Sequence, residues 1–325
     1  MANEFYTDGA PNHLANPTTV TTAANFIKEL WSDEVLAVYK ANTVMVPLVQ
    51  SMPFSGQKGD TIHIPKPSRG SVNAKAAGTA VTVNVETAGV FNLTIDQHFE
   101  YSRLIEDIAR IQALDSMRQF YTDDAGYAHA LSLDSALHSE GAKFAGSSTT
   151  PTVAGSAYSK AVIGGDGSTT WVQTGSGNGS ALTDAGIRRA IQWLDDNNVP
   201  ARQRALVVPP VEKRRLMGLA RFTEQAFVGE SGSSNTIRNG LIGDIYGIPV
   251  YVSTNVATVD SSDCTSYRAC LLFQKEAVVM AEQLAPRAQQ QYKQEFLADL
   301  FTVDTIYGLG TPRPEAGVAL MVPAS

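Results

Sequence analysis

Residues 81–95 read VTVNVETAGVFNLTI, and this stretch decides the fold that we expect of the 325-residue chain. Apolar and polar side chains alternate on both sides of a central Thr-Ala-Gly, with the period of two that β-strands show. The stretch therefore predicts a long two-stranded hairpin. An isolated hairpin is only marginally stable in water, so this one, if it projects, needs a partner surface to cover its apolar face. The apolar side chains of that face, which are the candidates for an inter-subunit contact, are Val81, Val83, Val85, Phe91, Leu93 and Ile95.

An arm with one amphipathic helix is expected before the hairpin. From Thr22 to Tyr39 the apolar residues lie three or four positions apart, which is the spacing of one helix face. A thin arm cannot bury Trp31 against itself, so we expect Trp31 to dock on a neighbouring lobe or subunit. Between the arm and the hairpin, GDTIHIPKPS at 59–68 predicts a short strand that its prolines end.

Two helices are expected after the hairpin. Residues 102–113 predict a short helix, and residues 115–143 predict a long one of about 29 residues and about 40 Å, which Gly141 ends. Residues 146–180 are rich in Gly, Ser and Thr, and so long a segment without regular structure is uncommon inside a compact domain. We interpret it as an exposed insertion that Trp171 anchors.

A mixed α/β lobe is expected from Ala181 onward, because helix and strand patterns alternate there. Thr183 is placed to cap a helix that Asp-Asn-Asn closes. ALVVPP at 205–210 predicts a buried strand whose prolines begin a second helix. Further strands are predicted at 248–253, 269–273 and 276–283, and residues 288–323 are again strand-like.

The glycine-rich run GLIGDIYG at 240–247 raises the question of phosphate binding. It lacks the Lys-Ser/Thr pair of a P-loop, and it precedes a strand instead of a helix N-terminus. We therefore interpret Gly240, Gly243 and Gly247 as turn residues with positive φ, and Pro249 as a residue suited to a strand start or a sheet edge.

The net charge argues against a protein that binds nucleic acid through contacts with its phosphates. The formal net charge is −7, whereas binding through phosphates usually requires a basic excess. The densest basic cluster lies between Arg202 and Arg221, and we interpret it as a helix surface or a subunit contact. No signal peptide is evident and no apolar run approaches the ~20 residues of a membrane helix, so no membrane contact is expected. Cys264 and Cys270 match no zinc spacing and indicate a reducing cytoplasm.

No catalytic, cofactor-binding or metal site is expected, and the chain is predicted not to be an enzyme. The five histidines are scattered, and His138 lies two residues from Glu140, on a different helix side. No Gly-x-Ser-x-Gly elbow is present. Lys75 is interpreted as an ordinary solvated lysine.

The order of these parts resembles that of the HK97-like major capsid proteins of tailed bacteriophages. Four stretches carry the resemblance: ELWSDEVLAVYKANTVMVPLV (29–49), GDTIHIPKPSRG (59–70), GLIGDIYGIPVYVSTNV (240–256) and the run from EAVVMAEQLAP to GVALMV (276–322). The resemblance implies an α+β fold of five parts. These are an N-terminal arm with the amphipathic helix (1–50), an extended β-hairpin loop (51–100), a peripheral domain with a long spine helix and the insertion (101–180), a mixed α/β axial domain (181–275) and C-terminal return strands of the peripheral domain (276–325).

The resemblance also implies a structural coat protein of the virion. Copies would form hexamers and pentamers of an icosahedral shell, assembled in the host cytoplasm, that encloses double-stranded DNA without sequence-specific binding. Only about 20 residues precede the first expected helix, so either a separate scaffolding protein or no scaffold is expected. A portal and a decoration protein are the other candidate partners. Two alternatives stay open: an encapsulin-like protein compartment, and a phage tail or fibre protein, for which the composition of 146–180 is the only support.

Overall fold

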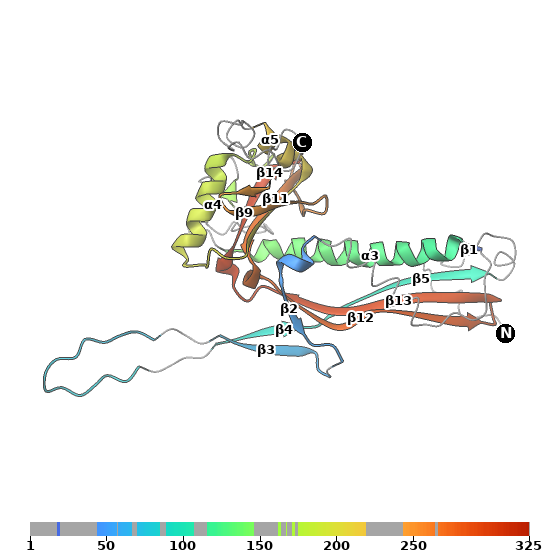
Figure 1. The fold of residues 1–325 in the computed structure, drawn as a ribbon, viewed down its shortest axis with the longest axis horizontal. Coiled ribbons are helices and arrows are strands. Elements are labelled where there is room, and N and C mark those ends of the chain that lie inside the picture. Colours follow the sequence, from blue (N-terminus) through green and yellow to red (C-terminus); the bar gives the residue numbers. More distant parts are fainter. Residues whose placement is uncertain are drawn as a thin grey trace. The chain divides into compact units, whose positions relative to one another are not determined.

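The computed structural model describes most of the chain (Figure 1). The described residues are 18–19, 44–56, 58–66, 70–84, 89–106, 116–145, 162–163, 167, 171–172, 175–218, 243–263 and 266–324. The amphipathic helix expected at 22–39, with Trp31, lies outside them, as do Val85 and Gly240.

The chain forms two compact units and contains both helices and sheets, as the expected α+β class requires. The first unit is built from residues within 1–43, 97–133 and 284–306, and the second from residues within 44–96, 134–283 and 307–325. Three elements contribute residues to both units: α3 (Ser116–Glu140), β12 (Val279–Lys293) and β13 (Ala298–Gly310).

One sheet has five strands in the order β1–β5–β13–β12–β2. In it, β1 is Thr18–Thr19, β5 is Gln97–Glu106 and β2 is Gln50–Pro53. β1 pairs parallel with the end of β5, and β2 pairs parallel with the start of β12. The short helix expected at 102–113 is therefore wrong for residues 102–106, which belong to β5. Pairing in the sheet overrides the local helical spacing of these residues.

The long helix expected over 115–143 is confirmed by α3 and the 3₁₀ turn that follows it, Gly141–Lys143. Within the first unit, α3 packs on the strands through a buried cluster of Ala125, Ala288, Phe301 and Val303, against which Tyr101 packs. The Tyr101 hydroxyl donates to Asp124 Oδ2 at 2.5 Å. Burial and this carboxylate raise the pKa of Tyr101. The helix is thus held to β5 by both apolar and polar contacts.

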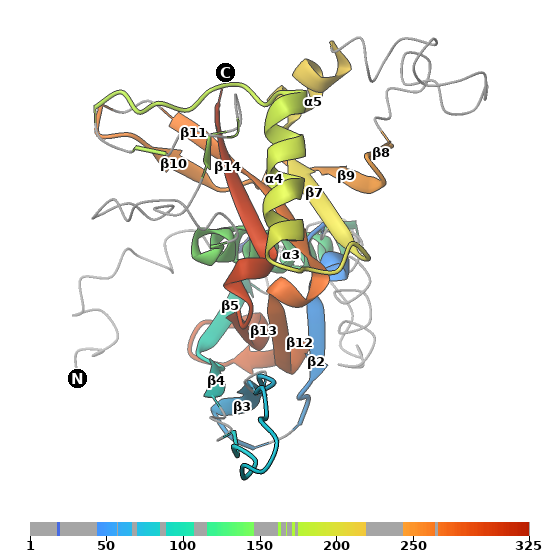
Figure 2. The ribbon, with the colours of Figure 1, turned by 90° about the vertical axis from the view of Figure 1, so that its left-hand side faces the viewer.

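A second sheet, of seven strands, lies in the second unit (Figure 2). Six strands follow the order β6–β14–β11–β7–β9–β8, and β10 pairs with β11. Their bounds are β6 Val162–Ile163, β14 Gly317–Pro323, β11 Ser266–Gln274, β7 Arg204–Val208, β9 Ile248–Val252, β8 Asp244–Ile245 and β10 Thr258–Asp260. The strands expected near 205–210, 248–253 and 269–273 are confirmed by β7, β9 and β11.

Helix α4 (Asp184–Asp196) lies beside β14 and β7 in this unit (Figure 2). Thr183 caps it as expected, because its hydroxyl accepts from Gly186 N at 3.3 Å. The prolines after β7 begin α5 (Pro210–Met217), also as expected. Local capping signals therefore identify both helix starts correctly.

The last strand, β14, lies in a different sheet from the one that the expected domain boundaries imply. Those boundaries place residues 276–325 among the return strands of a peripheral domain, but β14 pairs with β11 in the sheet that contains β7 and β9. The assignment is wrong for Gly317–Pro323. Six of these seven residues are buried, and an apolar strand with both faces covered suits the interior of a sheet.

The expected anchor of the insertion, Trp171, is confirmed as a fully buried side chain. Its ring meets Tyr267 of β11 edge-on, with ring centroids 4.7 Å apart. The Tyr267 hydroxyl donates to Ser176 O at 2.7 Å. This aromatic pair ties residues near 171–176 to the seven-stranded sheet.

A two-stranded hairpin, β3 (Thr61–Lys66) with β4 (Gly89–Thr94), forms the third sheet. The expected pairing of residues 81–85 with 91–95 is wrong, because the antiparallel partner of β4 is β3 and residues 81–84 form no strand. In the observed register Ile62 lies opposite Leu93 and Ile64 lies opposite Phe91. These apolar cross-strand pairs stabilise the observed register.

Two glycines of β13 let the chain approach β4 closely. A Cβ on Gly308 would lie 2.4 Å from Thr94 O, and one on Gly310 would lie 2.8 Å from Leu93 Cδ1. Leu93 is 1% exposed and Ile95 is 9% exposed. The inner face of the hairpin base therefore belongs to the core of its own chain.

A buried carboxylate on α3 holds the start of the second unit. Asp134 is fully buried, and its Oδ1 accepts from Met45 N at 2.9 Å and from Val44 N at 3.2 Å. Its Oδ2 accepts from Asn255 Nδ2 at 2.8 Å and lies 3.7 Å from His138 Nε2. Burial lowers the pKa of His138, and Asp134 opposes that shift. Asp134 and His138 lie four residues apart, the spacing that places two side chains on one face of a helix. Their proximity could therefore have been predicted from the sequence, where His138 was compared only with Glu140.

We expect Asp134→Ala to lower the free energy of unfolding by roughly 3–5 kcal/mol, because removing a buried charged acceptor strands its donors. Asn255→Ala removes one of the three hydrogen-bond donors to Asp134 described above and is expected to cost about 1–3 kcal/mol. Urea denaturation measures both. Ser135→Ala, at the exposed neighbouring position, is the control and should change stability by less than about 0.5 kcal/mol. A loss for Asp134→Ala no larger than that of the control would contradict this role.

A second prediction concerns the glycine contact at the hairpin base. Gly308→Ala should lower the free energy of unfolding by about 1–3 kcal/mol, because the new methyl group would meet backbone atoms of β4. Gly89→Ala is the matched control, since its nearest neighbour would be Lys66 O at 3.5 Å, an ordinary contact. Thermal or urea unfolding of the two variants compares them directly. Equal stabilities would show that β4 does not press against Gly308.

Candidate interaction surface

The loop between β3 and β4 is the largest exposed feature of the hairpin. Residues 70–84 are all exposed, and Figure 1 shows them as a long loop beyond the ends of the two strands. We call residues 70–84 the extended loop. Its tip turns at Ala76–Thr79, where Thr79 Oγ1 donates to Ala76 O at 2.8 Å and Gly78 has a φ of 78°. Only glycine adopts such a φ without strain.

Three valines of the extended loop expose most or all of their apolar side chains to solvent. Val72 is 101% exposed, Val81 is 71% exposed and Val83 is 81% exposed. Single exposed apolar residues are normal on protein surfaces, but several on one projecting loop mark a surface that another molecule can cover. Val81 and Val83 are thus accessible for the inter-subunit contact expected of them, and that contact stays a prediction.

The other apolar residues of the expected contact have different environments. Leu93 and Ile95 are buried in their own chain against β13, so an inter-subunit contact through them is wrong. Phe91 is half-buried, and its ring lies close to Gly310. The alternation of side chains correctly identified the apolar face of 91–95, but a sequence pattern does not say which molecule covers a face.

The glycine-rich stretch before β9 is a pair of turns. Gly243 has a φ of 64° and Gly247 a φ of 75°, in the positive region that the turn interpretation requires. Val250 N donates to Gly243 O at 3.1 Å, which closes the loop on itself. Pro249 is the second residue of β9, ahead of the residues that pair with β7. The chain leads from these turns directly into a strand, and not into a helix whose N-terminus could bind phosphate.

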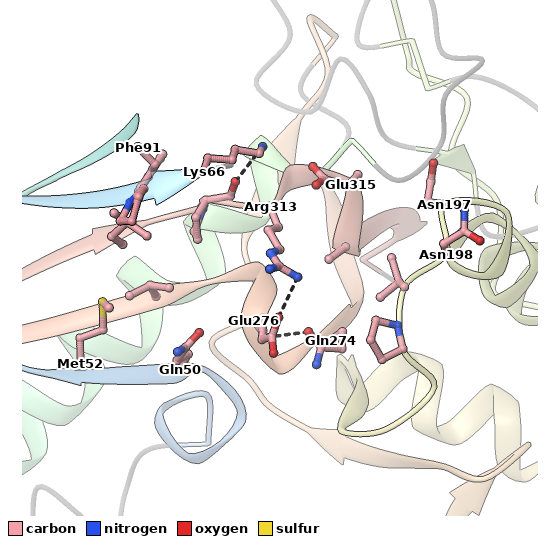
Figure 3. A pocket seen from close by; sticks show the side chains of 17 residues that line it. Gln50, Met52, Lys66, Phe91, Asn197, Asn198, Gln274, Glu276, Arg313 and Glu315 are labelled. Atoms are coloured by element: carbon pink, nitrogen blue, oxygen red, sulfur yellow. Dashed lines mark hydrogen bonds and ion pairs between the residues drawn. The ribbon is translucent and has the colours of Figure 1, made fainter. Parts of the chain in front are cut away.

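A hollow of about 650 Å³ opens beside the hairpin base (Figure 3). Its walls come from strands β2, β3 and β4, from one end residue each of β11 and β12, and from residues 197–200, which follow α4. Two 3₁₀ turns contribute as well, η4 (Lys275–Ala277) and η5 (Pro314–Ala316). Figure 3 shows Arg313 reaching Glu276, with Nη1 2.8 Å from Oε2, while Lys66 Nζ lies 3.4 Å from Pro312 O. The ion pair is about half exposed, and such pairs contribute about 0–1 kcal/mol.

The chemistry of this hollow is that of a mixed polar surface. None of the described residues that line it is Ser, Cys or His, so the lining contains no Ser–His or Cys–His pair. Across the described part of the chain, no group of three His, Cys, Asp or Glu side chains could hold a metal ion. Sequence reasoning missed the hollow because its walls come from segments far apart in the sequence.

The basic cluster between Arg202 and Arg221 is partly structural. Arg204 is buried and its Nη2 donates to Asp195 Oδ1 at 2.7 Å. Arg215 Nη1 donates to the buried Glu212, whose other oxygen accepts from Leu182 N at 2.9 Å. Burial raises the pKa of Glu212, and these two donors oppose the shift. Exposed members of the cluster include Arg202 and Arg214, and Arg221 lies outside the described residues.

None of the helices in the described ranges has both the length and the apolar character to cross a membrane. No family model matches the chain, and no curated protein matches it in sequence.

Solved phage structures resemble this chain closely in fold. A chain of Mycobacterium phage Che8 is 23% identical, with 86% of this chain and 90% of that chain covered and a TM-score of 0.65. The capsid structure of cyanophage P-SCSP1u gives 18% identity, coverage of 87% and 89% and a TM-score of 0.66. The mature capsid of bacteriophage PhiM1 gives 13% identity, coverage of 95% and 92% and a TM-score of 0.64. Because each likeness spans nearly the full length of both chains, this chain has the α+β fold of phage capsid structures, the HK97-like fold.

Proposed function

We propose that this chain is the major capsid protein of a tailed double-stranded DNA bacteriophage. Copies of it would assemble through hexamers and pentamers into an icosahedral shell. The observation that carries the proposal is the likeness in fold to solved phage capsids over nearly the whole chain. A role as a building block, without enzymatic activity, follows from that fold by analogy.

The extended loop supports the proposal on physical grounds. Ordering a loop costs conformational entropy, and residues 70–84 bury nothing that offsets the cost within their own chain. A neighbouring subunit in a shell would supply the missing contacts. Because every subunit contributes the same loop, many weak contacts add up to a stable closed assembly.

The charge of the chain fits a container for DNA. The net charge is −7, and Arg204 and Arg215 are used inside the chain. We propose that the shell encloses DNA without sequence-specific binding, in a virion that assembles in the host cytoplasm. A separate scaffolding protein, a portal and a decoration protein are the proposed partners, and Trp31 stays the proposed docking residue of the N-terminal arm.

Electron microscopy of the expressed full chain tests the proposal. The chain is produced alone and together with its neighbouring genes, and we expect closed shells of uniform size. Nuclease-resistant DNA should accompany shells made with the neighbouring genes. Rods, discrete rings or unassembled subunits under both conditions would contradict the proposal, and shells filled with a protein cargo would indicate an encapsulin-like compartment.

Replacing residues 70–88 by a short glycine–serine linker should abolish shells without unfolding the subunit. The free energy of unfolding is expected to change by less than about 1 kcal/mol, because the described part of the segment, residues 70–84, is exposed throughout. Sedimentation measures assembly and urea denaturation measures stability. Normal shells from this variant would show that the extended loop makes no essential contact.

Point substitutions that keep the full length of the extended loop test the contribution of the valine side chains alone. Val81→Ser combined with Val83→Ser should raise the subunit concentration needed for assembly by about tenfold or more, because two apolar contacts are lost at every interface. Thr82→Ser, on the same arm between the two valines, is the matched control and should assemble normally.

A further inference from the structure

The two arms of the extended loop are joined by side chains. Asn73 Nδ2 donates to Asn84 Oδ1 at 2.6 Å, and Asn84 Nδ2 donates to Ser71 O. Neither arm belongs to a strand, and the arms form no ladder with each other in the described residues. We infer that Asn73 and Asn84 form a clasp, which positions the extended loop before it meets a second copy of this chain.

Asn84 is the centre of the clasp. A carboxamide carries both a donor and an acceptor, so one side chain can bridge the opposite arm at two points. Asn84 uses its oxygen for Asn73 and its nitrogen for the backbone of Ser71. An aspartate would keep the acceptor but would place a carboxylate against the Ser71 carbonyl.

The clasp and the turn at the tip constrain the loop at both ends. The tip is closed by Thr79, whose N–H and hydroxyl both donate to Ala76 O, at 3.4 Å and 2.8 Å. Val81 and Val83 lie between this turn and Asn84, on the arm that the two contacts bound. A loop ordered in advance loses less conformational entropy when it binds, so the same apolar contacts yield a tighter association.

The partner in this inference is a second copy, and that identification rests on the proposed capsid function. The role of the two asparagines as a clasp does not rest on it. The two statements therefore need separate measurements, one on the unassembled chain and one on assembly.

Trypsin probes the clasp in the unassembled full chain. Lys75 is the only Lys or Arg within residues 70–84, so cleavage after it reports how often the loop opens. We expect Asn84→Ala to be cleaved there about two- to tenfold faster than the unmodified chain. Asn73→Ala should be cleaved at an intermediate rate, because the bond from Asn84 to Ser71 O survives.

Two further variants sharpen the test. The variant that carries both alanine changes should be cleaved no faster than Asn84→Ala, since the side chain of Asn73 acts in the clasp through its hydrogen bond to Asn84. Asn84→Asp should also be cleaved faster than the unmodified chain. Thr82→Ala, on the same arm, is the control and should be cleaved at the unmodified rate. Equal rates for all variants, or additive effects of the two asparagine changes, would overturn the clasp.

Light scattering then measures the initial rate of assembly. The rate should fall in the same order, least for Asn73→Ala and most for Asn84→Ala, with Thr82→Ala unchanged. Assembly at the unmodified rate by variants that trypsin cleaves faster would overturn the role of the clasp in meeting a second copy. The predicted order of cleavage with no assembly by any chain, the unmodified one included, would support the clasp and overturn the proposed function.

Discussion

The close approach of β4 to the glycine backbone of β13 is the contact on which the candidate surface depends. Without side chains at Gly308 and Gly310, Leu93 and Ile95 can pack into the core, and β4 gains a fixed place beside β3. A fixed hairpin base then determines where the extended loop begins. The loop needs no core of its own, because its root is part of the folded subunit. An exposed contact element can in this way grow from a chain without loosening the chain's interior.

Local signals in the sequence predicted most helices and strands, but they did not predict which distant segments pair in the sheets. The spacing of apolar residues identified α3, and Thr183 marked the start of α4. Such signals act within a few residues, and in α3 and α4 the tertiary contacts agree with them. The partner of β4 and the sheet that receives β14 depend on contacts between residues far apart in the sequence. The same limit applies to residues 102–106, where a strand ladder replaced the expected helix.

The apolar residues expected at the inter-subunit surface also differ in how well the sequence predicted their environment. The exposure of Val81 and Val83 agrees with a role outside the subunit, since the described residues leave both side chains largely uncovered. Leu93 and Ile95 carry the same alternating pattern but lie inside, because β13 happens to present glycines there. Pattern alone reports that a face is apolar, and only the three-dimensional neighbours decide whether the subunit or its partner covers it. The hollow beside the hairpin base, with walls from distant segments, left no comparable trace in the sequence.

The carboxylate of Asp134 has a mechanical consequence. Val44 and Met45 donate to it directly, so a pull on the chain that precedes them is transmitted to α3 through two parallel hydrogen bonds. Both bonds end on a fully buried acceptor; the bond from Met45 is itself buried, and the bond from Val44 is part-buried. Asn255 holds the opposite oxygen and keeps the carboxylate from rotating under such a pull. Tension on the chain that precedes Val44 would therefore be resisted at α3 before it could separate β2 from β12.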